Sequence, residues 1–158
     1  MGHSKKHAII GLCTGQMYLV GAIYHIYKCF GSKDPKNPIN LAIICSSIYA
    51  TTMAHWYNMK PSGIAKTVDM ITVITSGLFV SFKESHKWNP IHRGREIWNS
   101  VLLMGGVTYV VNTVILSVPL LLPIDDEKLH LATMVAHTFW LHIMTNLTAM
   151  WCVWCETS

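Results

Sequence analysis

Five long apolar stretches alternate with short polar breaks along this 158-residue chain. Each stretch carries few charges and has the length that a helix needs to cross the hydrocarbon core of a bilayer. Continuous apolar runs favour helices over membrane β-barrel strands, which are shorter and alternate in polarity. We expect spans at residues 8–30, 39–57, 64–82, 97–122 and 129–154. The pattern predicts an all-α integral membrane protein, a single multi-pass domain made of a bundle of about five transmembrane helices.

Two features of the polar breaks refine this interpretation. Trp56 and Tyr57 close the second apolar stretch, as aromatic residues do at a membrane–water interface. The longest break, residues 83–96, is polar and mostly basic but contains Trp88 and Ile91. We expect it to lie on the lipid headgroups as a helix or loop.

Composition agrees with a membrane protein. Charged residues make up 13% of the chain and hydrophobic residues 51%, a balance far from that of a soluble domain. The net charge of +4 comes from lysines and arginines in the polar breaks, so it indicates contact with headgroups rather than with nucleic acid. The expected partners are therefore the lipid bilayer and other membrane subunits.

Histidines are the main candidates for chemistry. The chain has nine, and His25, His55, His137 and His142 fall within apolar stretches. Ionisable side chains inside a membrane are costly and usually face a bundle interior or a cavity. Neutral imidazole binds metals and haem iron and also carries protons. The alternative is that each imidazole hydrogen-bonds a neighbouring helix.

The second and third stretches predict a polar contact. Thr51 and His55 are four residues apart and share one helix face, and Ser47 lies one turn earlier. Asp69 follows a short turn, so it can reach the same level of the membrane. These residues together suggest a site at one end of a helical hairpin.

The last stretch leaves the histidine ligands open. His130 and His137 are seven residues apart and therefore aligned on a regular helix, whereas His137 and His142 are five apart and lie on different faces. A metal needs ligands that converge. Either this helix contains a bulge that brings His142 beside His137, or only one of the two belongs to the site.

Three short motifs resemble the CREST superfamily, which includes alkaline ceramidases and the progestin/adiponectin receptor family. They are Thr51 to His55 (TTMAH), Thr67 to Asp69 (TVD) and His137 to His142 (HTFWLH). The superfamily has seven spans, a serine hydroxyl and a final pair of histidines with three residues between them. This chain differs in all three respects.

The resemblance implies a zinc ion bound by His55, His137 and His142. Asp69 would act as the base or orient a water, and Thr51 or Ser47 would supply the hydroxyl. It further implies hydrolysis of a lipid amide or ester, in which the metal activates the water and polarises the carbonyl.

Two other classes of function remain open. A membrane anchor of a redox complex would bind haem b between two histidines from different helices, drawn from His25, His55 and His137. A channel, transport or assembly subunit would use the polar residues for helix contacts. The Gly11-x-x-x-Gly15 motif favours close helix packing and supports this last class.

Overall fold

The computed structural model describes residues 5–32, 36–58, 63–88, 90–117 and 126–157. Almost all of these residues are helical, and these ranges contain no β-strand. The prediction of an all-α chain is therefore confirmed for the part of the chain that the structure describes.

The long helices match the apolar stretches closely. Their bounds are Lys5–Gly31 (α1), Lys36–Asn58 (α2), Ile64–Phe79 (α3), Gly94–Ser117 (α4), Asp126–His137 (α5) and Thr145–Thr157 (α6). Two π-helical segments interrupt this regularity, Val80–Glu84 (η1) after α3 and Thr138–Met144 (η4) between α5 and α6. Short 3₁₀ turns, Ser85–Lys87 (η2) and Pro90–His92 (η3), connect η1 to α4. The predicted end of the fourth span, residues 118–122, lies outside the described residues.

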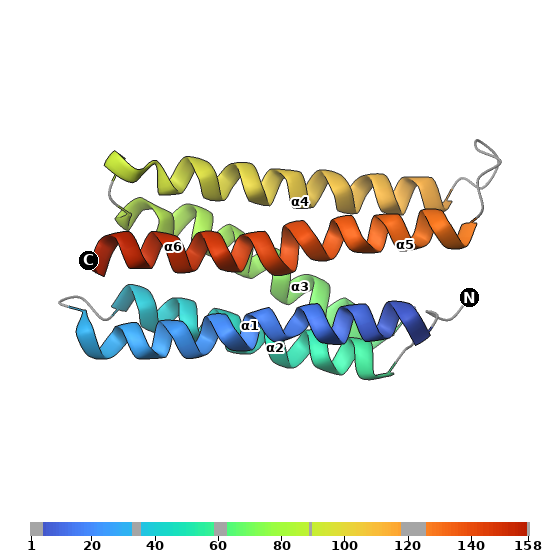
Figure 1. Cartoon of the computed structure of the whole chain (residues 1–158), viewed down its shortest axis with the longest axis horizontal. Helices are drawn as coiled ribbons and strands as arrows, with labels where there is room; N and C mark the ends of the chain where they lie inside the picture. The colour runs from blue at the N-terminus through green and yellow to red at the C-terminus, as the bar shows by residue number, and fades with distance from the viewer. Residues whose placement is uncertain (1–4, 33–35, 59–62, 89, 118–125, 158) are drawn as a thin grey trace.

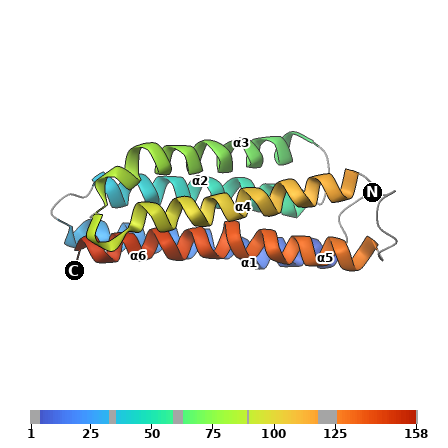
Figure 2. The ribbon, with the colours of Figure 1, turned by 90° about the horizontal axis from the view of Figure 1, so that it is seen from above.

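The helices form one elongated bundle in which successive long helices run in opposite directions (Figure 1). The α5, η4 and α6 segments follow one another along a single rod, which runs beside α1 and α4. Helix α3 lies on the outer side of the bundle, as the second view shows (Figure 2). It packs mainly on α2, and Gly77 is its buried residue.

Small residues bring α1 and α2 together. A Cβ atom added to Gly11 would collide with the indole ring of Trp56, and one added to Gly15 would collide with Met53. Glycine thus permits the close approach that the Gly-x-x-x-Gly motif predicts. Trp56 is 6% exposed because it fills this contact, so it is a packing residue, whereas Tyr57 is exposed as expected at an interface.

The connection between α3 and α4 differs from the expected surface segment. Its side chains Glu84, Ser85 and Trp88 are buried. The ring of Trp88 meets that of Trp98 edge to face at 6.0 Å, and both belong to the main apolar core. Arg93, with φ of 52°, makes the turn into α4. Part of this segment is therefore folded into the core, whereas Ile91 and His92 are exposed.

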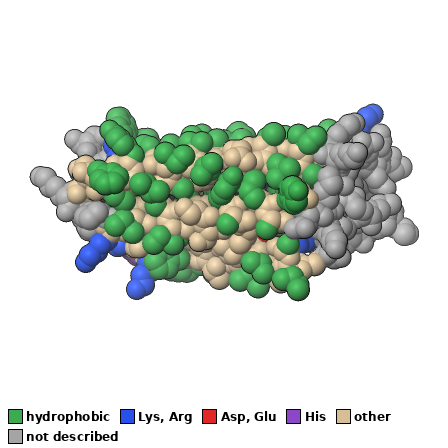
Figure 3. Space-filling view, turned by 90° about the horizontal axis from the view of Figure 1, so that it is seen from below, with side chains coloured by type: hydrophobic (Ala, Val, Ile, Leu, Met, Phe, Trp, Pro, Cys, Tyr) green, Lys and Arg blue, Asp and Glu red, His purple; other side chains and the backbone are tan. Residues whose placement is uncertain are grey.

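Within the described ranges, two helices are long and apolar enough to cross a membrane, His7–Gly31 and Ile64–Lys87, the latter taking in α3, η1 and η2. Apolar side chains are more than half exposed on each of α1 to α5, namely Ile23, Ile43, Ile74, Leu103 and Val135. On the face in Figure 3, apolar side chains cover the middle, and lysine and arginine lie towards the ends.

Candidate functional site

His137 and His142 lie side by side, because the helix that carries them is π-helical between them. Five residues of regular α-helix would rotate the second side chain by about 140° from the first. The η4 segment fits an extra residue into the turn, and the two ring centroids are 5.5 Å apart. The bulge is therefore present, and both residues of this histidine pair face the same region.

The spacing of the histidine pair suits a metal. Two imidazoles on one tetrahedral zinc, each bound at about 2.1 Å, place their ring centroids roughly 5 Å apart. The Nδ1 atom of His137 is buried and has no hydrogen-bond partner among the described residues. Buried polar atoms in native proteins are normally satisfied, so this nitrogen is suited to bind a ligand.

Thr14 on α1 determines which nitrogen of His142 is available. Its hydroxyl donates to the Ile10 carbonyl at 2.8 Å and lies 3.0 Å from His142 Nδ1. A hydroxyl has one proton, so towards the imidazole it accepts a hydrogen bond. His142 must then carry its proton on Nδ1, which leaves the lone pair of Nε2 free. An outer partner of this kind is typical of metal-binding histidines.

His55 stands on the neighbouring helix α2 and is the third histidine predicted for the site. It is 6% exposed and its ring packs on Trp56 at 4.8 Å between centroids. The His55 and His137 side chains are close enough to interact electrostatically. In the described part of the chain, however, no three His, Cys, Asp or Glu side chains form a closed metal-ligand group. The spacing of the histidine pair fits a zinc ion, and His55 is an imidazole on another helix that interacts with His137.

Asp69 meets α2 as the sequence predicts. Its Oδ1 accepts hydrogen bonds from Thr51 at 3.0 Å and from Thr52 at 2.8 Å. Within the described ranges no donor bonds Oδ2. Asp69 is also close enough to Tyr18 to interact with it electrostatically, which places the carboxylate towards the side of the bundle that holds His142. The two threonines fix the carboxylate and leave one oxygen available.

Other predicted residues lie away from this contact. Ser47 is exposed and donates to the Ile43 carbonyl at 2.9 Å, so Thr51 is the hydroxyl that reaches Asp69. His130 belongs to α5, but its side chain lies outside the described residues. His25 is completely buried with both ring nitrogens unpartnered among the described residues. It lies seven residues along α1 from Tyr18, about 10 Å from the level of the histidine pair.

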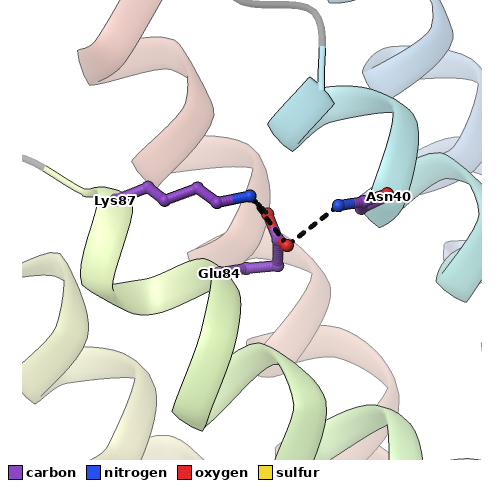
Figure 4. Close-up of polar contacts among 3 residues, drawn as sticks. All are labelled: Asn40, Glu84 and Lys87. Atoms are coloured by element: carbon purple, nitrogen blue, oxygen red, sulfur yellow. Dashed lines mark hydrogen bonds and ion pairs between the residues drawn. The ribbon is translucent and has the colours of Figure 1, made fainter.

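A second buried polar cluster lies near the other end of the bundle, around Glu84, the last residue of η1. Lys87 donates to both carboxylate oxygens at 3.0 and 2.9 Å, and Asn40 donates to Oε1 at 2.9 Å (Figure 4). With its amide nitrogen towards Glu84, Asn37 donates to Oε2 at 3.1 Å and accepts from Trp88 Nε1 at 3.3 Å. We call Asn37, Asn40, Glu84 and Lys87 the carboxylate cluster. Each carboxylate oxygen in it has two donors.

Three residues near the histidine pair, Thr14, Tyr18 and Thr52, were not predicted from the sequence, and Asn146 was expected only as one of the polar residues for helix contacts. Thr52 shares Asp69 with Thr51, Thr14 bonds His142, Tyr18 bonds the Leu141 carbonyl and Asn146 bonds the His142 carbonyl. The sequence could have indicated Thr52, since it is a second hydroxyl residue directly after Thr51. Asn146 was visible as an amide one turn after His142. Thr14 and Tyr18 come from a distant helix, and no local pattern points to them.

Comparison with known proteins gives no relative. No protein-family model matches the chain, and neither a curated protein nor a solved structure matches it.

Proposed function

We propose that this protein is a multi-pass membrane hydrolase that uses zinc to cleave a lipid amide or ester. The observation that carries the proposal is the convergence of His137 and His142 across the π-helical turn, at 5.5 Å between ring centroids. A π-helical turn in a long helix frequently occurs at a functional site. Here it joins two imidazoles whose spacing in sequence would otherwise separate them.

The five helical rods span the bilayer. Exposed apolar side chains on α1 to α5 support this, as do the antiparallel course of the helices and the position of the charges towards the ends (Figure 3). Backbone polar groups inside a bilayer must be satisfied internally, which helices achieve. The histidine pair then lies at membrane depth, inside the bundle.

In the proposed site, His137 and His142 bind the metal and His55 completes the set from α2. Zinc, when bound, lowers the pKa of a coordinated water and polarises the carbonyl of the substrate. Thr14 keeps the proton of His142 on Nδ1, so that Nε2 has its lone pair free for the metal. His137 contributes a nitrogen that no protein group occupies among the described residues.

Asp69 orients the attacking water and takes its proton. Its Oδ1 is held by Thr51 and Thr52, which constrains the carboxylate and leaves Oδ2 for the water. A general base of this kind must be held within hydrogen-bond reach of the proton that it removes. The two threonine hydroxyls supply that constraint from the adjacent helix.

A lipid is the substrate class that suits the surroundings. Apolar side chains are exposed on α1 to α5, so in a bilayer lipid molecules would surround the helices that carry the site. The amide or ester group is the polar part of the substrate that meets the histidine pair.

The geometry favours zinc over haem b for the histidine pair. Two axial imidazoles must lie on opposite faces of a porphyrin, whereas His137 and His142 project from one turn of one helix. His25 is buried on α1 at another level, and no second imidazole is described beside it.

The proposal is tested by elemental analysis and an absorption scan of the detergent-purified protein, followed by a screen of lipid amides and esters. We expect about one zinc per chain and no Soret band. His142→Ala should lose the zinc, and His25→Ala, which removes a buried imidazole outside the site, should retain it. A Soret band would contradict the proposal and favour a haem b membrane anchor of a redox complex. Absence of both zinc and haem would contradict both and leave a channel, transport or assembly role.

A further inference from the structure

The π-helical turn that joins the histidine pair leaves one backbone carbonyl without its helical partner. In an α-helix the N–H of Thr145 would donate to the carbonyl of Leu141. Here it donates to the carbonyl of Trp140, one residue earlier. The Leu141 carbonyl is deprived of that bond, and Leu141 itself is buried. An unsatisfied carbonyl at membrane depth is costly, because hydrocarbon offers it no hydrogen-bond donor.

Side chains replace the missing bond. The Tyr18 hydroxyl, from α1, donates to the Leu141 carbonyl at 2.7 Å, and the Thr145 hydroxyl also bonds this oxygen. The Asn146 amide donates to the next carbonyl, that of His142, at 2.7 Å. The turn is thus stabilised by donors that lie outside the helical backbone, and Tyr18 is the one that comes from another helix.

Tyr18 is placed for this purpose. It is 4% exposed, and its ring packs against that of His142 at 5.4 Å between centroids. It lies four residues after Thr14, so both side chains project from the same face of α1 towards η4. Three residues further along, a Cβ on Gly21 would lie 2.5 Å from Asn146 Oδ1, so glycine lets α1 approach the α6 side of the turn.

We propose that Tyr18 is a positioning residue which, together with Asn146, keeps Thr138–Met144 π-helical and thereby holds His137 and His142 on one face. If the turn relaxed to α-helix, His142 would rotate away by about 140° and the pair would separate. The relevance of this to catalysis rests on the proposed function. The geometric claim concerns the two imidazoles alone, and it can be tested without zinc or substrate.

The test uses Cu²⁺ as a probe of the full-length, chelator-treated protein in detergent. Two imidazoles that converge bind one Cu²⁺ together, and nitrogen superhyperfine structure in the electron paramagnetic resonance spectrum counts them. The background replaces His55, the proposed third ligand, by glutamine so that the histidine pair can be counted alone, and it does the same for the histidines outside the apolar stretches: His3, His7, His86, His92 and His130. In this background we expect a spectrum with two bound imidazoles, which His137→Ala reduces to one or none.

Tyr18→Phe removes only the hydroxyl, and Asn146→Leu removes only the amide. Each should weaken Cu²⁺ binding by about 10-fold or more and convert the two-imidazole spectrum to a one-imidazole spectrum, in line with the effect of outer-shell changes on metal sites. Tyr24→Phe, also on α1, is the matched control. Its ring contacts His25 rather than the turn, so the two-imidazole spectrum should persist.

Deletion of Phe139 separates positioning from folding. Phe139 lies in the turn and is 44% exposed, and its removal gives a regular α-helix in which the two histidines are four residues apart and still share a face. In this deletion variant, Tyr18→Phe should no longer affect Cu²⁺ binding. If Tyr18→Phe loses Cu²⁺ binding both with and without Phe139, Tyr18 has a general folding role and the proposal is overturned. The proposal is also overturned if Tyr18→Phe leaves the two-imidazole spectrum unchanged in the chain that retains Phe139. A protein without native zinc that still shows these Cu²⁺ results would refute the proposed function and leave the positioning role intact.

Discussion

In the described part of the bundle, two of the buried polar clusters lie at π-helical segments. At one end, η1 places Glu84 among Lys87, Asn37 and Asn40, and every carboxylate oxygen receives two donors. Elsewhere, η4 brings His137 and His142 together, and the buried Nδ1 of His137 receives none within the described residues. The same departure from regular helix therefore gives a saturated cluster in one place and an open one in the other.

The difference separates a structural role from a binding role. A buried carboxylate with all its acceptor positions occupied gains nothing from a further ligand, and its bonds join α2 to the segment after α3. A buried imidazole nitrogen without a donor or acceptor costs free energy unless something binds it. A π-helical segment alone is thus weak grounds for a functional site, and the saturation of the side chains that it positions is the stronger criterion.

The largest expected effect is that of His137→Ala on zinc. Loss of a direct ligand should weaken zinc binding by more than about 100-fold, because outer-shell changes alone cost about 10–100-fold. The melting temperature of the zinc-free protein should change little, since no hydrogen bond to Nδ1 is lost. Isothermal titration and differential scanning fluorimetry measure the two quantities. A strong destabilisation of the zinc-free protein would make His137 a structural residue like Glu84.

Asp69→Asn tests the proposed base. The amide keeps the size of the side chain but cannot take a proton, so the rate of lipid hydrolysis should fall by about 10²–10⁴-fold, the contribution of a general base. Zinc content should remain at the level of the unmodified protein. Hydrolysis at an unchanged rate would remove Asp69 from the mechanism.

Glu84→Ala should lower the stability of the protein without changing its zinc content. It removes the acceptor of two asparagine amides and a lysine, and we expect a loss of about 3 kcal/mol in the free energy of unfolding, moderated because Lys87 reaches solvent. Glu96→Ala is the control, since its ion pair with Arg93 is exposed and should contribute nothing measurable. Denaturation in mixed micelles and zinc analysis distinguish the two clusters. If Glu84→Ala loses zinc but keeps its stability, the carboxylate cluster has a binding role rather than a structural one.

The smallest effect is expected for Thr14→Val, which keeps the shape of the side chain. It removes the acceptor that holds the His142 proton on Nδ1, so zinc affinity should fall by about 10-fold, at the lower end for an outer-shell partner. Thr75→Val serves as the control, because Thr75 is exposed and its hydroxyl bonds only backbone carbonyls of its own helix. Equal zinc affinities in the two variants would show that the His142 tautomer does not depend on Thr14.

The sequence predicts the parts of this arrangement that depend on local pattern. Apolar stretches locate the helices, and the short turn between α2 and α3 places Asp69 beside Thr51. The spacing of His137 and His142 shows that a bulge is required if both belong to one site, but it does not show that the bulge forms. The bulge depends on Tyr18, 123 residues away in sequence from the carbonyl that it satisfies.

The burial of the carboxylate cluster could not be predicted from the sequence. The segment around Glu84 is polar and basic, so the sequence indicates a surface position. Burial of Glu84 becomes favourable only when Asn37 and Asn40, on another helix, supply donors. Whether a polar residue of this kind is exposed or buried depends on hydrogen-bond partners from other helices, which the periodicity of the sequence does not reveal.

The central claim is that the π-helical turn in the last helical rod builds a metal site from His137 and His142. X-ray absorption at the zinc edge of the purified full-length protein tests it most directly, because the spectrum reports the ligands around the metal. We predict zinc with at least two imidazole ligands at about 2.0–2.1 Å, reduced by at least one in His142→Ala. Zinc bound only by sulfur, or an imidazole count that His142→Ala leaves unchanged, would contradict the account.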